Sequence, residues 1–348
     1  MKSKRIMLLS HEMTYTGAPN SLLNLAILLK SHGNRISVFT LKPGDFAKEF
    51  LKKGICVNAI LESVFNFPSL SGYDLIIANT IFCSSFAVKA QRFAPTVLYI
   101  REAQNLPDII SDCGLNSECL SLAENIVCVS EYAERFIRNN YNVKNLLVLH
   151  NFLNKPILYK PKKNISKDGK IHFLVAGTIE KRKGFDVALN ALNLLSDDIR
   201  QQAVLHLAGK KPEWSRKYWE HLRFDIPGVV YHGEITDKRK MFRLYDDINC
   251  VIVTSIDESC SLTALEGAMH GRALIVTENV GAKYIVNGNG FIVKTGSAES
   301  LAEAMSFMVN NSSELEFMGK RSYKNFQNTS VPKIYYEKFA DITAQIKE

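Results

Sequence analysis

The chain has 348 residues, which predicts about two domains, because a single hydrophobic core rarely serves more than ~250–300 residues. Hydrophobic residues make up 46% and charged residues 22%, values that exclude a disordered, collagen-like or coiled-coil chain. Lys and Arg number 43 against 35 Asp and Glu, and the net charge of +8 suits an anionic ligand, a nucleic acid, an anionic membrane face or simply solubility.

The cysteines predict a reducing compartment. Their number, seven, is odd, none forms a C-x-x-C pair, and most stand in apolar runs, which indicates core thiols and neither a disulfide framework nor a zinc site. The first apolar run, Ile6–Leu9, is too short for a signal peptide, which needs ~7–15 apolar residues, or for a membrane helix, which needs ~18. We therefore expect a cytoplasmic protein without a spanning segment.

Short apolar runs alternate with helical patterns through the first half of the chain. The expected strands are Arg5–Leu9, Ile36–Thr40, Asp74–Ala78, Thr96–Ile100, Asn125–Ser130 and Leu146–Leu149. Helices are predicted from Pro19 to Gly33, over Phe46–Lys53 and over Glu131–Asn140. Continuous apolar strands that alternate with helices predict a parallel sheet covered on both faces.

Lys155–Lys170 breaks this pattern, since it is polar, basic and interrupted by proline, as interdomain linkers are. The alternation then resumes. Its expected strands are Ile171–Ala176, Val204–Ala208, Val229–Tyr231, Asn249–Thr254 and Ala273–Val276, and its helices are Phe185–Leu195, Lys238–Tyr245, Leu262–His270, Ala298–Val309 and Lys333–Lys347. The prediction is an α/β protein with two doubly wound domains, residues 1–160 and 161–330, and a C-terminal helix, 331–348, that is a candidate to cross back to the first domain.

Two loops stand where open α/β sheets bind ligands, beyond the carboxyl ends of strands and at helix N-termini. Gly17 precedes the first long helix, where a backbone amide can approach an anion closely. The loop Gly177–Gly184 carries three consecutive cations, Lys181 to Lys183, which can neutralise a diphosphate or can form a solvated charge run. Neither a P-loop nor a G-x-G-x-x-G dinucleotide motif is present in the sequence.

Two glutamates follow the strand Asn249–Thr254. Glu258 lies in the loop after it, and Glu266 lies in the helix for which Ser261 is the expected N-cap. Two carboxylates at the exit of one strand can bind hydroxyl groups on different parts of one ligand. The alternative interpretation is a pair of solvated surface glutamates.

Taken in order, these elements resemble the family 4 retaining glycosyltransferases of GT-B fold over essentially the whole chain. The matching elements are Thr16-Gly17-Ala18-Pro19, Cys128-Val129-Ser130-Glu131 with His150-Asn151, Gly177–Gly184, Gly209, His232-Gly233, the E-x7-E pair Glu258 and Glu266, Gly271 and Gly281. The sequence departs from the family pattern at four places: Phe152 replaces the glycine after Asn151, Thr178 replaces a usual Arg, Ser259-Cys260-Ser261 replaces Gly-Phe-Gly, and Arg101-Glu102 stands where a His is frequent.

The resemblance implies two Rossmann-like domains facing a cleft, and transfer of a sugar with retention from a nucleotide-diphosphate sugar, with UDP favoured. It implies Glu258, Lys183 and Arg182 as catalytic residues. The substrate-binding residues that it implies are Gly17, Thr178, Gly209, His232, Gly233, Ser261, Leu262, Glu266, Arg101 and Glu102. No cofactor and no metal are expected, because no Asp-x-Asp stands at a strand end to bridge an ion to phosphates.

Two other functions stay open at this point. A nucleotide-sugar epimerase of the same fold would convert the donor without an acceptor. A basic nucleic-acid-binding protein is the third class, although no reader motif supports it.

The expected acceptor is a saccharide or lipid-linked molecule in the synthesis of surface polysaccharide or glycoconjugate. The predicted helix Phe46–Lys53 carries Lys48, Lys52 and Lys53 beside apolar residues, which predicts peripheral contact with an anionic membrane at the cytoplasmic face. The alternative is that its apolar residues, Phe50 and Leu51, pack on the sheet and its lysines are solvated.

Overall fold

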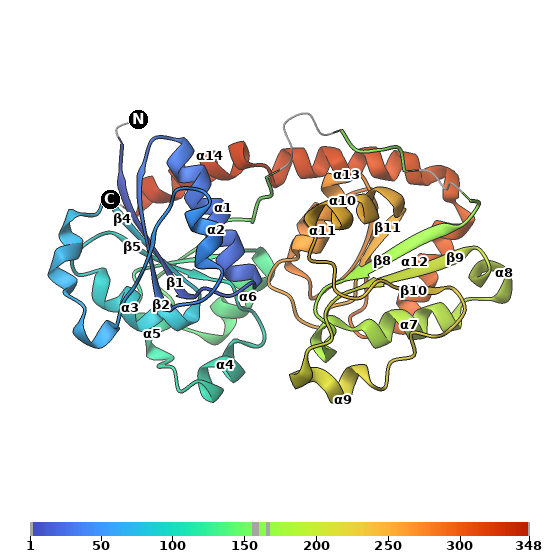
Figure 1. The fold of residues 1–348 in the computed structure, drawn as a ribbon, viewed down its shortest axis with the longest axis horizontal. Coiled ribbons are helices and arrows are strands. Elements are labelled where there is room, and N and C mark those ends of the chain that lie inside the picture. Colours follow the sequence, from blue (N-terminus) through green and yellow to red (C-terminus); the bar gives the residue numbers. More distant parts are fainter. Residues whose placement is uncertain (1–2, 155–159, 165–167, 347–348) are drawn as a thin grey trace. The chain divides into compact units, whose positions relative to one another are not determined.

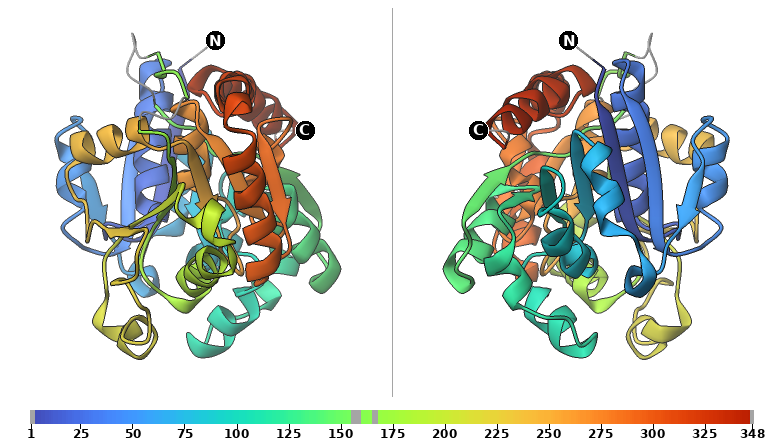
Figure 2. Two further views of the ribbon diagram at one scale, coloured as in Figure 1. Left: turned by 90° about the vertical axis from the view of Figure 1, so that its right-hand side faces the viewer. Right: turned by 90° about the vertical axis from the view of Figure 1, so that its left-hand side faces the viewer.

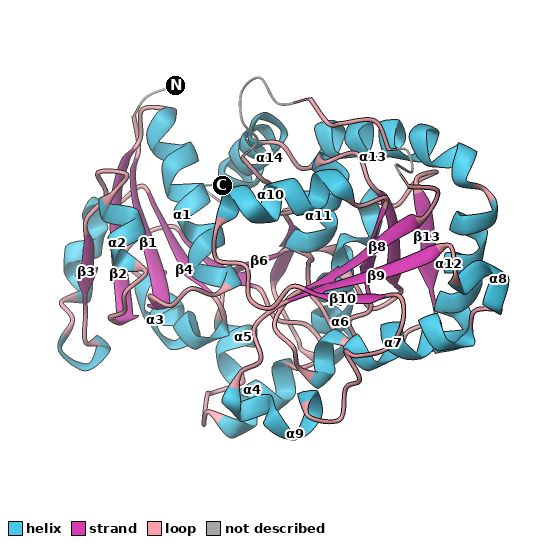
Figure 3. Cartoon of the chain, turned by 45° about the vertical axis from the view of Figure 1, so that its right-hand side comes forward, coloured by secondary structure: helices cyan, strands magenta, loops and turns pink. Residues whose placement is uncertain are grey.

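The computed structural model describes residues 3–154, 160–164 and 168–346. The chain divides into two compact units, one formed by Met1–Asn154 with Pro332–Glu348 and the other by Lys155–Val331. Each unit is a parallel sheet between helices (Figures 1 and 3). Of the predicted linker Lys155–Lys170, residues 155–159 and 165–167 lie outside the described residues.

The first unit has a seven-stranded sheet in the order β3-β2-β1-β4-β5-β6-β7, with every pair parallel. Its strands are β1 Arg5–Glu12, β2 Arg35–Lys42, β3 Val57–Ala59, β4 Leu75–Asn79, β5 Thr96–Ile100, β6 Asn125–Cys128 and β7 Asn145–Val148. All residues of β4 and β5 are buried, as the continuous apolar runs predict. The twist of this sheet can be followed in the right view of Figure 2. The strand order reverses between β1 and β4, so the carboxyl ends of these strands border the usual ligand position.

The helices of the first unit include one from the end of the chain. They are α1 Gly17–Ser31, α2 Ala47–Leu51, α3 Ser84–Ala90, α4 Leu106–Asp112, α5 Glu118–Leu122, α6 Glu131–Asn140 and α14 Pro332–Gln345. Helix α14 lies beside α1 (Figure 1), where the ring of Tyr336 stacks on His32 with centroids 3.6 Å apart. Tyr335 of α14 is buried against Phe152, with ring centroids 4.5 Å apart. Aromatic contacts therefore hold α14 in the first unit.

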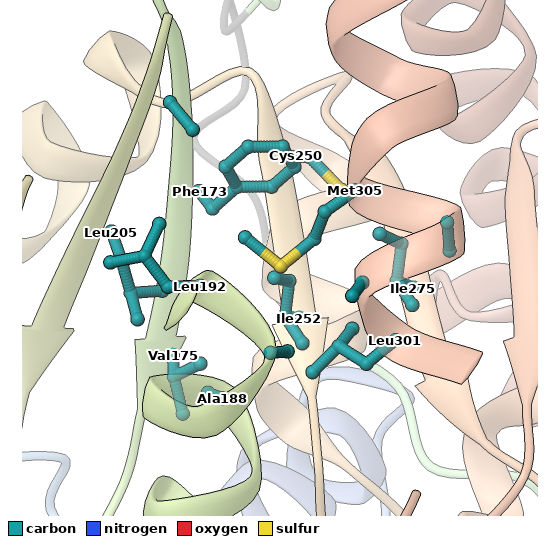
Figure 4. Close-up of a cluster of buried hydrophobic side chains, with 14 of the residues drawn as sticks. Phe173, Val175, Ala188, Leu192, Leu205, Cys250, Ile252, Ile275, Leu301 and Met305 are labelled. Atoms are coloured by element: carbon teal, nitrogen blue, oxygen red, sulfur yellow. The ribbon is translucent and has the colours of Figure 1, made fainter. Parts of the chain in front are cut away.

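The second unit has a six-stranded parallel sheet in the order β10-β9-β8-β11-β12-β13. Its strands are β8 Ile171–Ala176, β9 Ala203–Ala208, β10 Val229–Tyr231, β11 Cys250–Val253, β12 Ala273–Thr277 and β13 Gly290–Val293, and its helices are α7 Phe185–Leu194, α8 Asp197–Arg200, α9 Arg216–Trp219, α10 Lys238–Asp247, α11 Leu262–Met269, α12 Ala298–Asn310 and α13 Leu315–Thr329. One face of the sheet packs under α7 and α12, where Phe173, Leu192 and Met305 meet (Figure 4). In this second sheet, the strand order reverses between β8 and β11.

The prediction missed two strands and several helices, among them α13. Strands β3 and β13 are short edge strands whose residues are largely half-buried or exposed, so they lack the apolar run that marks the central strands. Helix α13 buries Leu315, Gly319, Ser322 and Phe326, which lie on one helix face, but a glycine and a serine among them leave too few apolar residues to mark that face in the sequence.

The predicted helix Phe46–Lys53 is shorter, and its aromatic residues face the protein. Phe50 is fully buried in α2 and Phe46 is 5% exposed, whereas Leu51 is 63% exposed. Lys48 and Lys52 form ion pairs with the preceding acidic residues, Asp45 at 2.6 Å and Glu49 at 2.7 Å. The alternative is therefore confirmed for Phe50, which packs inside the unit, and is wrong for Leu51, which is exposed. Among the described residues, no helix combines the length and the apolar character that crossing a bilayer needs.

Candidate donor and acceptor sites

The predicted cationic loop and the predicted glutamate loop lie side by side in the second unit. The loop Gly177–Gly184 follows β8, and the loop from Thr254 to Ser261 follows β11, so both leave the sheet at its strand reversal. The hydroxyl of Thr254 donates to the Lys183 carbonyl at 2.8 Å, and the amide of Ile256 donates to the Arg182 carbonyl at 2.8 Å. These bonds fix the backbone of the cationic loop against the strand exit that carries Glu258.

Two glycines allow this close approach. Gly184 has φ of +65°, and a Cβ there would collide with the carbonyl oxygen of Thr254. At Gly209, after β9, a Cβ would collide with the carbonyl oxygen of Gly177. The loop after β8 therefore packs backbone to backbone on both neighbouring strand exits.

Lys183 and Glu258 form an ion pair at the centre of this edge. Lys183 Nζ lies 2.6 Å from Glu258 Oε2, which also accepts a bond from the Ser255 hydroxyl at 2.7 Å. The side chains of Lys183 and Glu258 are 18% and 16% exposed, so the pair is reachable from solvent. Main-chain bonds to Asn279 at 3.1 Å and Gly281 at 2.7 Å hold Glu258 in place. Residues far apart in the sequence thus present a cation and a carboxylate together.

Arg182 is engaged within the same loops. Its Nη1 donates to the carbonyl of Asp257 at 2.9 Å, and its Nη2 lies 2.6 Å from Glu180 Oε1. The guanidinium therefore links the two loops and keeps a fixed orientation. Thr178, in the same loop, is half-buried.

Helix α11 begins at Leu262, directly after this loop. The Ser261 hydroxyl accepts from the amide of Ala264 at 3.3 Å, which confirms the predicted N-cap. One helix turn further, Glu266 accepts a bond from the Tyr245 hydroxyl at 2.6 Å. Burial raises the pKa of the Glu266 carboxyl, and the Tyr245 bond opposes that rise by stabilising the charged form. Tyr245, at the end of α10, has no sequence signal that links it to Glu266.

The ends of β9 and β10 add the next two predicted positions. The amide of Gly209 donates to the Gly233 carbonyl at 2.8 Å, and the amide of His232 donates to the Leu207 carbonyl at 2.9 Å. His232 itself is exposed. All ten predicted residues that belong to the second unit therefore lie at or near one edge of its sheet.

In the first unit, Gly17 starts helix α1 at the carboxyl edge. Thr16 places no side-chain cap on this helix, and its first turn contains no acidic residue. Nothing stands within 4 Å of the position that a Cβ would take on Gly17. The first amides of α1 are thus open to an anionic group.

Arg101 and Glu102 follow β5 at the same edge. Arg101 Nε donates to Asn79 Oδ1 at 2.6 Å and its Nη1 donates to Asn151 Oδ1 at 3.0 Å, while the guanidinium lies 4.4 Å from the Tyr99 ring centroid. Uncharged groups therefore position this cation. Asn79 was not singled out in the sequence, because only the sheet order brings it beside Arg101.

Glu102 is 9% exposed, and its carboxylate accepts a bond from the Arg101 amide at 2.8 Å. Burial raises its pKa to about 7, against the effect of that bond and of the Arg101 charge. Next to it, Thr80 has φ of +81°, a conformation that costs a threonine about 1–3 kcal/mol. The strained residue stands at the exit of β4, beside the strand reversal. A strained backbone and a carboxyl with a raised pKa, both at the carboxyl edge of the same sheet, indicate a functional site.

The described residues contain no group of three or more His, Cys, Asp or Glu side chains arranged to hold a metal ion. Metal independence stays a prediction.

Two doubly wound parallel sheets, with a cation and a carboxylate paired at the carboxyl edge of the second, are the arrangement expected of a GT-B glycosyltransferase. The family model described as "Glycosyl-transferase family 4" matches residues 2–100, and the model described as "Glycosyl transferases group 1" matches residues 170–311. Each of these models describes a glycosyltransferase domain, and between them they match both units of the chain. It is 22% identical over 416 residues to alpha-1,3/1,6-mannosyltransferase ALG2 of Dictyostelium discoideum, a match that covers 96% of this chain and 99% of that protein.

Solved structures have the same fold. Alr3699/HepE of Anabaena, in complex with UDP, superposes with a TM-score of 0.80 at 17% identity and covers 98% of this chain and 100% of its own. The lipopolysaccharide outer core galactosyltransferase WaaB, in its apo form, superposes with a TM-score of 0.70 at 16% identity over 93% of this chain and 98% of its own. The protein is a glycosyltransferase, and the comparisons support neither the epimerase nor the nucleic-acid-binding alternative.

Proposed function

We propose that the protein transfers a sugar, with retention of anomeric configuration, from a UDP-sugar to a saccharide or lipid-linked acceptor in surface polysaccharide or glycoconjugate synthesis. The observation that carries the proposal is the Lys183–Glu258 pair at the strand reversal, with Glu266 one turn into the helix α11 that follows. The UDP complex of HepE supports the nucleotide, and the names of ALG2 and WaaB support the acceptor class.

Lys183 and Arg182 hold the diphosphate in this proposal, aided by the first amides of α11. Negative charge grows on the leaving diphosphate in the transition state, so fixed cations stabilise that state more than the ground state. The bonds of Arg182 to Asp257 and Glu180 orient its guanidinium before the donor arrives. Donor binding gives Lys183 a phosphate partner in place of Glu258.

Glu258, released from Lys183, binds hydroxyls of the donor sugar and offsets the positive charge of its oxocarbenium-like transition state. Glu266 accepts bonds from the ribose hydroxyls. Retention follows from attack by the acceptor on the face that the diphosphate leaves, without a protein nucleophile. The protein cations take the place of a metal ion, so chelator leaves the rate unchanged, and recovery by magnesium of a chelator-treated, inactive enzyme would contradict this.

The acceptor binds the first unit, near Arg101 and Glu102. A lipid-linked acceptor requires peripheral contact with a cytoplasmic membrane face. In α2, the ion pairs of Lys48 and Lys52 reduce the positive charge available to lipid headgroups. Co-sedimentation with neutral and with anionic vesicles measures this contact, and equal recovery with both would leave a soluble acceptor as the better candidate.

A thermal-shift series with UDP, GDP, ADP and CDP tests the donor site. A nucleotide at ~100 times its dissociation constant stabilises the folded state by about 2.7 kcal/mol. UDP should give the largest shift, Lys183→Ala should reduce it, and Lys181→Ala, which changes an exposed cation of the same loop, should not. If none of the nucleotides shifts the melting curve, the proposed donor class is wrong. Incubation of donor sugar without acceptor should leave the sugar unchanged, in contrast to an epimerase.

A further inference from the structure

Three histidines form a hydrogen-bonded row across β8, β9 and β10. His206 lies between the others, with its Nε2 2.8 Å from His172 Nδ1 and its Nδ1 2.8 Å from His232 Nε2. Adjacent rings have centroids 5.1 Å apart in both pairs. At the far end, His172 Nε2 lies 3.1 Å from a carboxylate oxygen of Asp168. The row, Asp168-His172-His206-His232, spans the sheet diagonally.

The row occupies the sheet face opposite the core under α7 and α12. Phe173 and Leu205 point into that core, and their neighbours His172 and His206 point the other way because side chains alternate along a strand. The strand register agrees with this alternation. The Cα partners of His206 are Leu174 on β8 and Val230 on β10, which lie two residues from His172 and His232 and therefore on the same face. His232 follows β10 and reaches the carboxyl edge, beside Gly209.

The carboxylate gives the row one direction. A neutral imidazole has one N–H donor and one acceptor nitrogen, and a carboxylate only accepts. His172 must therefore donate from Nε2 to Asp168, which leaves its Nδ1 to accept from His206. The same step repeats, so His206 Nδ1 accepts from the Nε2–H of His232. The last ring is left with a bare Nδ1, which has no hydrogen-bond partner among the described residues.

His206, the central ring, is uncharged over the physiological range. Burial, and then the neighbouring His172 and His232, lower the pKa of His206 to about 4, while Asp247 and Asp168 oppose the shift. Burial also lowers the pKa of His232. Near pH 8 imidazole groups are generally uncharged, and the directional pattern is therefore tested at that pH.

We infer that this row holds His232 in its Nε2–H tautomer and so presents Nδ1 as a hydrogen-bond acceptor that selects a nucleobase with a ring N–H. This inference rests on the proposed function and sharpens it. Uracil has a ring N–H at N3, whereas cytosine has a lone pair at that atom. A bare Nδ1 attracts the first and repels the second, so His232 is a specificity residue for UDP over CDP.

Nitrogen-15 NMR of the full chain, labelled at histidine and recorded near pH 8, tests the row itself. His232 should show a protonated Nε2 and a bare Nδ1. Asp168→Ala removes an exposed carboxylate and should give His232 mixed tautomers, whereas Asp225→Ala, the matched exposed control, should not. A protonated Nδ1 on His232 in the unchanged chain, or no response to Asp168→Ala, would overturn the assignment.

Calorimetric titration with UDP and with CDP tests the ligand. The unchanged chain should prefer UDP by roughly tenfold or more, because CDP would place the lone pair of cytosine N3 against the lone pair of His232 Nδ1. His232→Ala should remove most of that preference, and His232→Gln, whose amide oxygen accepts, should restore part of it. His221→Ala, at an exposed histidine outside the row, should keep it.

A UDP preference that survives His232→Ala would overturn the selection of the base while the proposed function stands. If the unchanged chain binds neither nucleotide, the proposed function and the base selection fail together, and the NMR result still decides whether the row has its direction.

Discussion

The carboxyl edges of the two sheets handle charge in opposite ways. In the second unit, Lys183 and Glu258 neutralise each other at 2.6 Å and remain partly exposed. In the first unit, Arg101 is positioned by the amides of Asn79 and Asn151, and Glu102 is buried with its pKa raised to about 7. The edge of the second sheet holds two paired charges, whereas the edge of the first sheet holds a carboxyl that titrates near neutral pH.

This difference fits the two chemical tasks that we propose. A diphosphate and a cationic transition state need full charges that change partners, which the exposed pair provides. An acceptor hydroxyl needs hydrogen bonds more than charge, and a carboxyl that titrates near neutral pH can donate or accept one. The predictions below test this contrast, beginning with the largest effect.

Loss of either member of the exposed pair should be the most costly change for the reaction. Lys183→Ala and Glu258→Ala should each reduce turnover by about 10²-fold or more, because each removes a charge that acts in the transition state. Initial rates with a UDP-sugar measure this effect. Thermal melting is the control, since loop-end polar residues contribute little to stability. Near-normal rates at normal stability would refute the role of that residue.

The contribution of Glu102, in the first unit, to the free energy of unfolding should decrease as pH rises. The folded chain binds this proton more tightly than the unfolded chain, so the stabilisation present at low pH is lost as pH rises from about 4.5 to about 7. Glu102→Gln should remove that loss, which amounts to about 3 kcal/mol for a shift of this size. Denaturant unfolding between pH 5 and about pH 8 measures how the free energy of unfolding changes with pH in each variant. The control Glu234→Gln, at an exposed site, should keep the pH dependence of the unchanged chain. An equal pH slope in Glu102→Gln would disprove this assignment.

The glycines at the two edges should respond differently to the same substitution. Gly184→Ala adds a Cβ against the Thr254 carbonyl at positive φ and should destabilise the folded chain by roughly 1–3 kcal/mol. Gly17→Ala meets open space, so the melting temperature should hold. A Cβ on Gly17 hinders the approach of an anion to the first amides of α1, so affinity for the full donor should fall. Equal melting temperatures for both variants would contradict this contrast.

The smallest expected effect compares two matched N-caps. Ser261 caps α11, and Ser130 caps α6 by accepting from Ala133 at 3.2 Å. Either serine changed to alanine should lower stability by about 1 kcal/mol. Only Ser261→Ala should also raise KM for the donor, because its helix start faces the diphosphate in the proposed function. An unchanged KM in Ser261→Ala would remove that helix start from the donor site.

The positions of the central elements were predictable from local patterns. Strand β5 and helix α6 have the predicted bounds, because a buried parallel strand is a continuous apolar run and a helix needs an N-cap and a period. The short edge strands β3 and β13 have no comparable signal, since partners on one side leave half their residues in solvent.

The sequence by itself determined the two-part α/β architecture and the identity of the charged loops, because periodicity and loop chemistry are local properties. Only the tertiary structure decided which charges meet. The pairs Lys183–Glu258 and Tyr245–Glu266, and the row that ends at His232, join residues from different strands or helices. Which side chains come within bonding distance depends on the order and register of the strands, and these are set by packing of the whole sheet. The same reason applies to α2. Its basic amphipathic sequence predicted a membrane-facing helix, but the tertiary structure buries Phe50 inside the unit.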